Sequence, residues 1–108
     1  MIDQRIAPIL EELKTSLKAL YGNRLAQILL YGSYARGDFH DESDIDILVV
    51  LRQKTVDTYE EILRTADLVT ALNLKYSSII SLLYVTENRF LRSQMPVYQE
   101  IRNEGLTV

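Results

Sequence analysis

The sequence predicts a single mixed α/β domain, a small mixed sheet with helices packed on it, in the order α-β-β-α-β-α-α. Two observations carry this prediction. Apolar residues at the three- and four-residue spacing of helices alternate along the chain with short segments rich in Ile, Leu and Val, which are typical of strands. The length of 108 residues fits one domain, and no repeat or linker divides it, so residues 1–108 are predicted to form one unit.

The first third of the chain predicts a helix followed by a strand. Apolar residues recur at helical spacing with charged residues between them, and Gly22 is placed to end the helix. These apolar positions are Ile2, Ile6, Leu10, Leu13, Leu17 and Leu20. Leu25 to Tyr31 then predicts a buried strand that ends at Gly32, and a short polar connection follows from Ser33 to Ser43.

The middle of the chain predicts a strand, a helix and another strand. Ile45 to Leu51 is rich in Ile and Val and predicts the second strand. A second helix is indicated by apolar residues at helical spacing, and Thr58 with Glu61 forms a candidate capping box at its start. Its apolar positions are Tyr59, Ile62, Leu63, Ala66, Val69 and Leu72. Ile79 to Val85 predicts the third strand.

The end of the chain predicts two short helices. Thr86 precedes the first, and Pro96 can open the last, which Gly105 would close. In so small a domain the segment from Pro96 to Val108 is also a candidate surface for a partner. The tyrosines lie at positions compatible with a core, where their hydroxyl groups would point outward.

Composition excludes several classes of function. The chain has no cysteine, so it can have neither a disulfide framework nor a thiol nucleophile. The longest apolar run, Ile47 to Leu51, is far too short to span a membrane, and the N-terminus resembles no targeting peptide, so we expect a cytoplasmic protein. The net charge of −3 argues against direct binding of a long nucleic acid, although a nucleotide with a metal remains compatible with it.

Two short motifs flank the polar connection. Gly32 and Ser33 stand where a strand gives way to a turn, where backbone amides and a hydroxyl can approach a phosphate; alone, this pair more often merely ends a strand. Asp44 and Asp46 stand two residues apart at the start of the next strand. Their carboxylates would share one face, about 7 Å apart, and could bracket divalent cations, or they could be a solvated strand entry.

Together the two motifs are more specific than either alone. Ten residues separate Ser33 from Asp44. If the two strands are antiparallel neighbours, this connection brings the phosphate cradle and the carboxylate pair to one edge of the sheet. A nucleoside triphosphate needs both, because donors must bind its phosphates and carboxylates must hold its magnesium ions.

This segment resembles the signature of the polymerase-β-type nucleotidyltransferase superfamily and, more narrowly, the short bacterial minimal nucleotidyltransferases. Gly32-Ser33, Ala35-Arg36-Gly37 and Ser43-Asp44-Ile45-Asp46 carry the resemblance, which covers nearly the whole chain. It implies a polymerase-β-like fold and a hetero-oligomer with a HEPN-domain ribonuclease toxin, which members of this group typically have encoded by the adjacent gene. It also implies an antitoxin activity, the transfer of AMP from Mg-ATP to a tyrosine of that toxin.

The resemblance also assigns roles to individual residues. Gly32 and Ser33 would hold the triphosphate, and Asp44 and Asp46 would bind Mg²⁺ and serve as the catalytic residues. Arg36 could bind phosphate, or it could pair with Asp38 or Asp41. The lone His40 could act as a general base, but a lone exposed histidine usually has no such role, and this chemistry does not need one. Two loop aromatics, Tyr34 and Phe39, could stack on an adenine or anchor the loop.

One feature departs from the superfamily pattern. Many members carry a third carboxylate on a later strand, but residues 76–85 contain no acid. The alternative is therefore a weak or inactive nucleotidyltransferase-fold antitoxin that neutralises its partner by binding. A third class, small-molecule nucleotidyltransferases, usually adds a helical domain for the acceptor, and this chain is too short for one.

Overall fold

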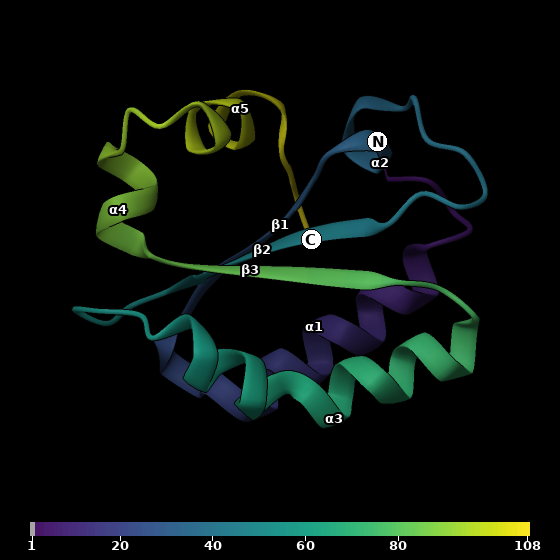
Figure 1. Cartoon of the computed structure of the whole chain (residues 1–108), viewed down its shortest axis with the longest axis horizontal. Coiled ribbons are helices and arrows are strands. Elements are labelled where there is room, and N and C mark those ends of the chain that lie inside the picture. Colours follow the sequence, from purple (N-terminus) through teal and green to yellow (C-terminus); the bar gives the residue numbers. More distant parts are fainter. Residues whose placement is uncertain (1) are drawn as a thin grey trace.

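A computed structural model describes residues 2–108, in which helices cover both faces of a four-stranded sheet (Figure 1). Helices α1 and α3 lie on one face, and α2, α4 and α5 lie on the other. The elements are α1 (Ala7–Tyr21), η1 (Gly22–Arg24, a 3₁₀ turn), β1 (Leu25–Tyr31), α2 (Ser33–Arg36), β2 (Ile45–Leu51), α3 (Thr58–Tyr76), β3 (Ile80–Thr86), α4 (Glu87–Arg92), α5 (Pro96–Glu104) and β4 (Leu106–Thr107).

The sheet is mixed, with the strand order β3-β2-β1-β4. Strands β1 and β2 are antiparallel neighbours, and their register runs from the pair Leu25 and Leu51 to the pair Tyr31 and Asp46. This confirms the condition on which the two motifs were predicted to meet. Strand β3 runs parallel to β2, as a connection through α3 requires.

The face under α1 and α3 carries the larger core. Alternate residues of β2, namely Ile45, Ile47, Val49 and Leu51, point into it and are fully or almost fully buried. The predicted stripe of α1 packs against them, with Leu10, Leu13 and Leu17 buried. The periodicity therefore predicted the helix and most of its buried face. Leu20 of the predicted stripe is exposed, and the helix begins at Ala7, after Ile2 and Ile6.

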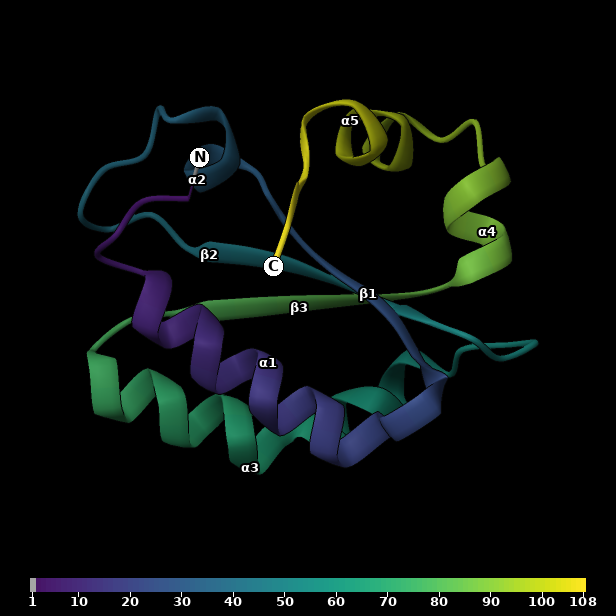
Figure 2. The ribbon, with the colours of Figure 1, turned by 180° about the vertical axis from the view of Figure 1, so that it is seen from behind.

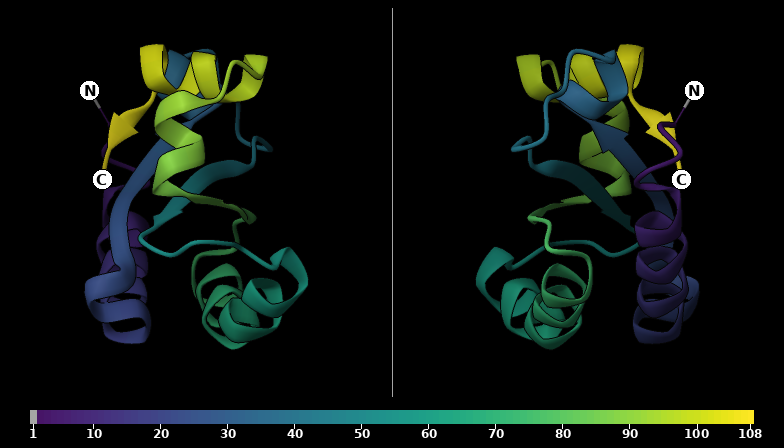
Figure 3. Two further views of the ribbon diagram at one scale, coloured as in Figure 1. Left: turned by 90° about the vertical axis from the view of Figure 1, so that its left-hand side faces the viewer. Right: turned by 90° about the vertical axis from the view of Figure 1, so that its right-hand side faces the viewer.

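The opposite face carries a smaller core under α4 and α5. Leu48 and Val50 of β2 point to this side, where they pack with Phe90 of α4 and with Tyr98 and Ile101 of α5. Figure 3 shows the sheet between the two helical layers when the molecule is viewed along its length. The segment beginning at Pro96, a candidate surface for a partner, thus packs its apolar face inside the domain.

Helix α3 forms as predicted, but the apolar stripe that marks it is largely outside the core. Tyr59, Ile62 and Leu63 are exposed, although Tyr59 had been placed at a core-compatible position. The residues buried in their place include Glu61 and Thr65. The predicted capping box is also wrong, because Asp57 is the N-cap and its side chain accepts a hydrogen bond from the amide of Glu60.

The polar residues buried under α3 are all satisfied. Glu61 accepts a hydrogen bond from the hydroxyl of Tyr21 at 2.5 Å and pairs with Nε of Arg64 at 3.1 Å. The hydroxyl of Thr65 bonds that of Tyr84 at 2.5 Å. Burying a polar side chain costs little free energy when the side chain is hydrogen-bonded. Helix α3 can therefore bury the face that carries Glu61 and Thr65 and leave its apolar stripe exposed to solvent.

Three smaller differences separate the prediction from the structure. The polar connection begins with the short helix α2, β3 lies one residue later than predicted, and the two-residue strand β4 was not predicted. In β4, Leu106 and Thr107 pair with β1. None of the helices within residues 2–108 combines the length and apolar character needed to cross a membrane.

Candidate functional site

The first part of the site is the sharp turn at the end of β1. Gly32 has a φ of 74°, in the region that favours glycine, and its carbonyl accepts hydrogen bonds from the amides of Ala35 and Arg36, both at 3.1 Å. A β-carbon at Gly32 would collide with Oδ2 of Asp46. The absence of a side chain at Gly32 is therefore what allows the carboxylate of Asp46 to lie against the turn.

The second part is the start of β2. Strand alternation places Asp46 on the same face as Leu48 and Val50, under α5, while Ile45 and Ile47 point into the other core. Asp46 is half-buried, and Asp44, one residue before the strand, is exposed. The prediction that Ile45 and Ile47 point into the core is confirmed, and the shared face of the two carboxylates stays a prediction.

A cavity of about 330 Å³ joins the two parts. Gly32, Ser33, Arg36 and Asp46 all line it, so four of the five predicted site residues border one space. Asp44 does not line the cavity, but its charge acts on Asp46. The ten-residue connection thus brings the Gly32-Ser33 motif close to Asp46.

The surroundings of Asp46 shift the pKa of its carboxyl group. Burial raises the pKa of the Asp46 carboxyl above its ordinary value, and the negative charge of Asp44 raises it further, while Arg36 opposes the rise. Ionisation of Asp46 is therefore less favourable than that of an ordinary aspartate. A cation bound beside the two carboxylates would relieve both effects.

Arg36 and the rest of the connection form a local network. Nε of Arg36 pairs with Asp38 at 3.2 Å, so of the two alternatives considered for Arg36 the ion pair is present, and the same guanidinium still borders the cavity. Tyr34 and Phe39 stack on each other with ring centroids 4.4 Å apart, which anchors the loop. His40 accepts a hydrogen bond at Nδ1 from the amide of Glu42.

Helix α5 contributes residues that sequence reasoning missed. Glu100 and Glu104 line the cavity together with Val97 and Ile101. These acids lie more than fifty positions after Asp46 in the sequence, and only the packing of α5 on the sheet brings them to the same cavity. Their spacing of one helical turn was the one available signal, and it is common on solvated helix faces.

The donor set fits a divalent cation with a phosphate ligand. Carboxylate oxygens are the ligands that Mg²⁺ prefers, and the first amide groups of a helix have no partner within it. Three acids, Asp46, Glu100 and Glu104, line the cavity with one base, Arg36. These acids would repel a negatively charged triphosphate, so a triphosphate would need accompanying cations to bind there. Within residues 2–108, no three acidic, histidine or cysteine side chains lie close enough to share one ion.

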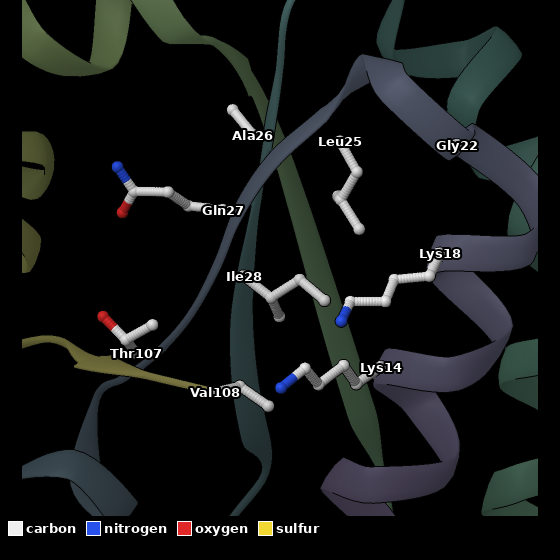
Figure 4. Close-up of a pocket in the computed structure, with 9 residues that line it drawn as sticks. All are labelled: Lys14, Lys18, Gly22, Leu25, Ala26, Gln27, Ile28, Thr107 and Val108. Carbon is white, nitrogen blue, oxygen red and sulfur yellow. The ribbon is translucent and has the colours of Figure 1, made fainter.

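A second cavity, of about 490 Å³, lies between α1 and the edge formed by β1 and β4 (Figure 4). Lys14 and Lys18 extend toward Ile28 and Val108 there, and no acid lines it. It offers no carboxylate, the ligand through which proteins usually hold magnesium. The cavity beside Asp46 is therefore the better candidate for metal-assisted chemistry.

Comparisons with known proteins agree with this geometry. A family model described as the nucleotidyltransferase domain matches residues 10–102. A protein of Methanocaldococcus jannaschii that is named, by inference, a protein adenylyltransferase is 42% identical over 81 residues, which cover 75% of this chain and 74% of that protein.

Two solved structures share the fold. A structure described as an inferred minimal nucleotidyltransferase aligns with a TM-score of 0.62 at 22% identity and covers 99% of this chain and 97% of that chain. A chain from the complex of a tri-AMPylated Shewanella oneidensis HEPN toxin with an MNT antitoxin aligns with a TM-score of 0.51 at 24% identity, over 95% and 67% of the two chains. The family match over residues 10–102 and the shared fold lead to one conclusion: this chain belongs to the nucleotidyltransferase domain family.

Proposed function

We propose that this chain is an antitoxin that transfers AMP from Mg-ATP to a tyrosine of a cognate HEPN-domain ribonuclease toxin and thereby neutralises it. One observation carries the proposal: the carboxylate of Asp46 lies against Gly32, in a cavity that Ser33 and Arg36 also line. The likeness to a protein named for adenylyl transfer, and to a fold seen beside an AMPylated toxin, supports the choice of acceptor class.

In this proposal the residues of the chain position the triphosphate. The amides at the Gly32 turn and the hydroxyl of Ser33 bind phosphate oxygens, and the guanidinium of Arg36 lies at the rim of the same cavity. Asp44 and Asp46 would hold Mg²⁺, which supplies positive charge to the α-phosphate and to the leaving pyrophosphate.

The reaction itself is an in-line displacement. The acceptor hydroxyl oxygen forms a bond to the α-phosphorus, and the bond from that phosphorus to the bridging oxygen breaks. Pyrophosphate leaves, and the hydroxyl proton is released. No residue of this chain has to form a covalent intermediate, because positioning and charge stabilisation suffice.

The alternative is a binder that neutralises its partner without turnover. The observation that favours it is the count of acids, because β3 contributes none to the site. Ser81 of β3 is the register partner of Asp46 and is exposed, so it occupies the position where an acid on β3 would stand beside Asp46. If the missing acid limits the rate, Ser81→Asp will accelerate transfer, with Ser81→Asn as the uncharged control.

The test of the proposed site is the paired substitution Asp44→Asn with Asp46→Asn. We expect it to abolish AMP transfer to the protein encoded by the adjacent gene, with the circular dichroism spectrum unchanged. Transfer at the wild-type rate in this variant would overturn the site. A stable complex with the partner but no transfer by the wild-type chain would favour the binder.

A further inference from the structure

An apolar stripe runs along the solvent side of α3. Tyr59, Ile62, Leu63 and Ala66 follow the spacing of one helical face, and Leu74 continues it toward the other end. Tyr59 is 70% exposed, Leu63 59% and Leu74 78%. Isolated exposed apolar residues are ordinary, but several on one face, toward both ends of a helix, indicate an interaction surface.

The stripe lies on the side of α3 that faces away from α1. Glu61 bonds Tyr21 of α1, and Thr65 bonds Tyr84 of β3. A helix turns about 100° per residue, so Thr65 lies about 40° around the axis from Glu61, and Ile62 lies about 100° in the same direction. The exposed stripe therefore begins where the contacts with β3 end.

The outer edge of β3 lies beside this stripe. Strand β3 is the end strand of the sheet, and within residues 2–108 no other strand pairs with its outer side. The amide of Ile45 donates to the carbonyl of Ile79, so the alternating backbone groups of Ile80, Leu82 and Tyr84 point away from β2. The amide of Ile80 donates to Oδ1 of Asn73 at 2.9 Å, which leaves the groups of Leu82 and Tyr84 on the open edge. The seven residues of β3 include no charge and no proline, the features that usually protect a free edge.

The two features face the same side of the molecule. In Figure 1, α3 and β3 lie nearest the viewer, whereas in Figure 2, seen from behind, α1 and β1 are in front. The contacts agree, because α3 packs under β3 and α1 under β1. One flat partner could therefore cover the stripe and the strand edge together.

We infer that this side is the interface between two copies of the chain. Strand β3 pairs antiparallel with β3 of the second copy, and α3 packs antiparallel against the second α3. One two-fold axis satisfies both contacts and joins the two four-stranded sheets into one. The catalytic cavity lies on the opposite face of the sheet and stays open.

The pattern of α3 is complementary to itself, which favours a second copy over an unrelated partner. Antiparallel pairing sets the Tyr59 end of one helix against the Leu74 end of the other. The exposed residues between the two ends, Ala66, Thr70 and Ala71, are small and allow the helices to approach closely.

The test measures the oligomeric state of the purified chain by sedimentation equilibrium. We expect a dimer, and we expect Leu63→Glu to raise its dissociation constant by about 30-fold or more. Leu91→Glu is the matched control, because Leu91 of α4 is equally exposed, at 57%, and lies outside the interface. Ile62→Lys provides a second variant, and circular dichroism verifies that each one folds.

Amide hydrogen exchange reports on the strand edge directly. We expect the outward amides of Leu82 and Tyr84 to be protected in the wild-type dimer and in Leu91→Glu, and to exchange in Leu63→Glu. A wild-type chain that stays monomeric at every concentration, or a dimer that Leu63→Glu and Leu91→Glu affect equally, would overturn the inference. None of these outcomes depends on AMP transfer.

Discussion

Strand β2 presents different kinds of side chain on the two faces of the sheet. Toward α1 and α3, β2 presents Ile45, Ile47 and Val49, which are buried in a dry core. Toward α5, the same strand presents Asp46 before Leu48 and Val50, and the pKa of that carboxyl is raised by burial and by a like charge. The core under α1 and α3 thus stabilises the fold, whereas the half-buried carboxylate at the site on the other face costs folding free energy.

The largest effect of breaking this division is expected at Gly32. Gly32→Ala would force the carboxylate of Asp46 away from the turn, so AMP transfer should fall by about 100-fold. Gly37→Ala is the matched control, because Gly37 also has a positive φ, 87°, but no atom lies near its missing β-carbon. Initial rates at saturating Mg-ATP measure both, and an equal loss in the two variants would contradict the role given to Gly32.

The next largest effect is expected in the core under α1. Leu13→Ala removes a fully buried side chain and should lower the free energy of unfolding by about 2–5 kcal/mol. Transfer per folded molecule should be unchanged, because Leu13 is on the face away from the cavity. Urea denaturation measures the loss, with the partly exposed Leu20→Ala on the same helix as the control. Similar losses at the two positions would contradict the assignment of the core.

A smaller effect is expected at the buried acid of α3. Glu61→Ala leaves the hydroxyl of Tyr21 and the guanidinium of Arg64 without their partner and should cost about 1–3 kcal/mol of unfolding free energy. Combined with Tyr21→Phe, the loss should be smaller than the sum of the single losses, because the two groups are coupled. Strict additivity in this urea denaturation cycle would show that the hydrogen bond contributes nothing.

The smallest effect has the opposite sign. Asp46→Asn removes an acid whose pKa is raised in the folded state, so at neutral pH it should increase the free energy of unfolding by about 0.5 kcal/mol, after allowance for solvent screening. The gain should disappear as the pH falls through the raised pKa to below about 4, because Asp46 is then neutral in both states. Thermal melts at neutral and acid pH measure it, and a destabilised variant at pH 7 would contradict the strain assigned to this carboxylate.

Much of the fold followed from the sequence, and the failures have physical causes. Strands β1 and β2 were predicted with their observed bounds, because short segments rich in Ile, Leu and Val that are bounded by turn residues are typical of buried strands. Helical periodicity located α1 and α3 equally well. It identified the buried face of α1 only, because the hydrogen bonds of Glu61 and Thr65 let α3 bury a polar face. The strand β4 has two residues and no periodic signal.

The candidate site was predictable in its local parts only. Gly32, Ser33 and Asp46 were predicted because they flank a short connection between two strands that are adjacent in the sequence and in the sheet. The acids Glu100 and Glu104 reach the same cavity through the packing of Tyr98 and Ile101 on the sheet, a tertiary contact that no local pattern encodes. Whether these acids share in transfer is open to test with Glu100→Gln and Glu104→Gln.

The most direct test of the central claim is the intact mass of the protein encoded by the adjacent gene, after incubation with this chain, ATP and Mg²⁺. We predict a gain of one or more AMP units, which is lost when both Asp44 and Asp46 are replaced by Asn. An unchanged partner mass, with a stable complex still formed, would contradict enzymatic transfer and leave neutralisation by binding alone.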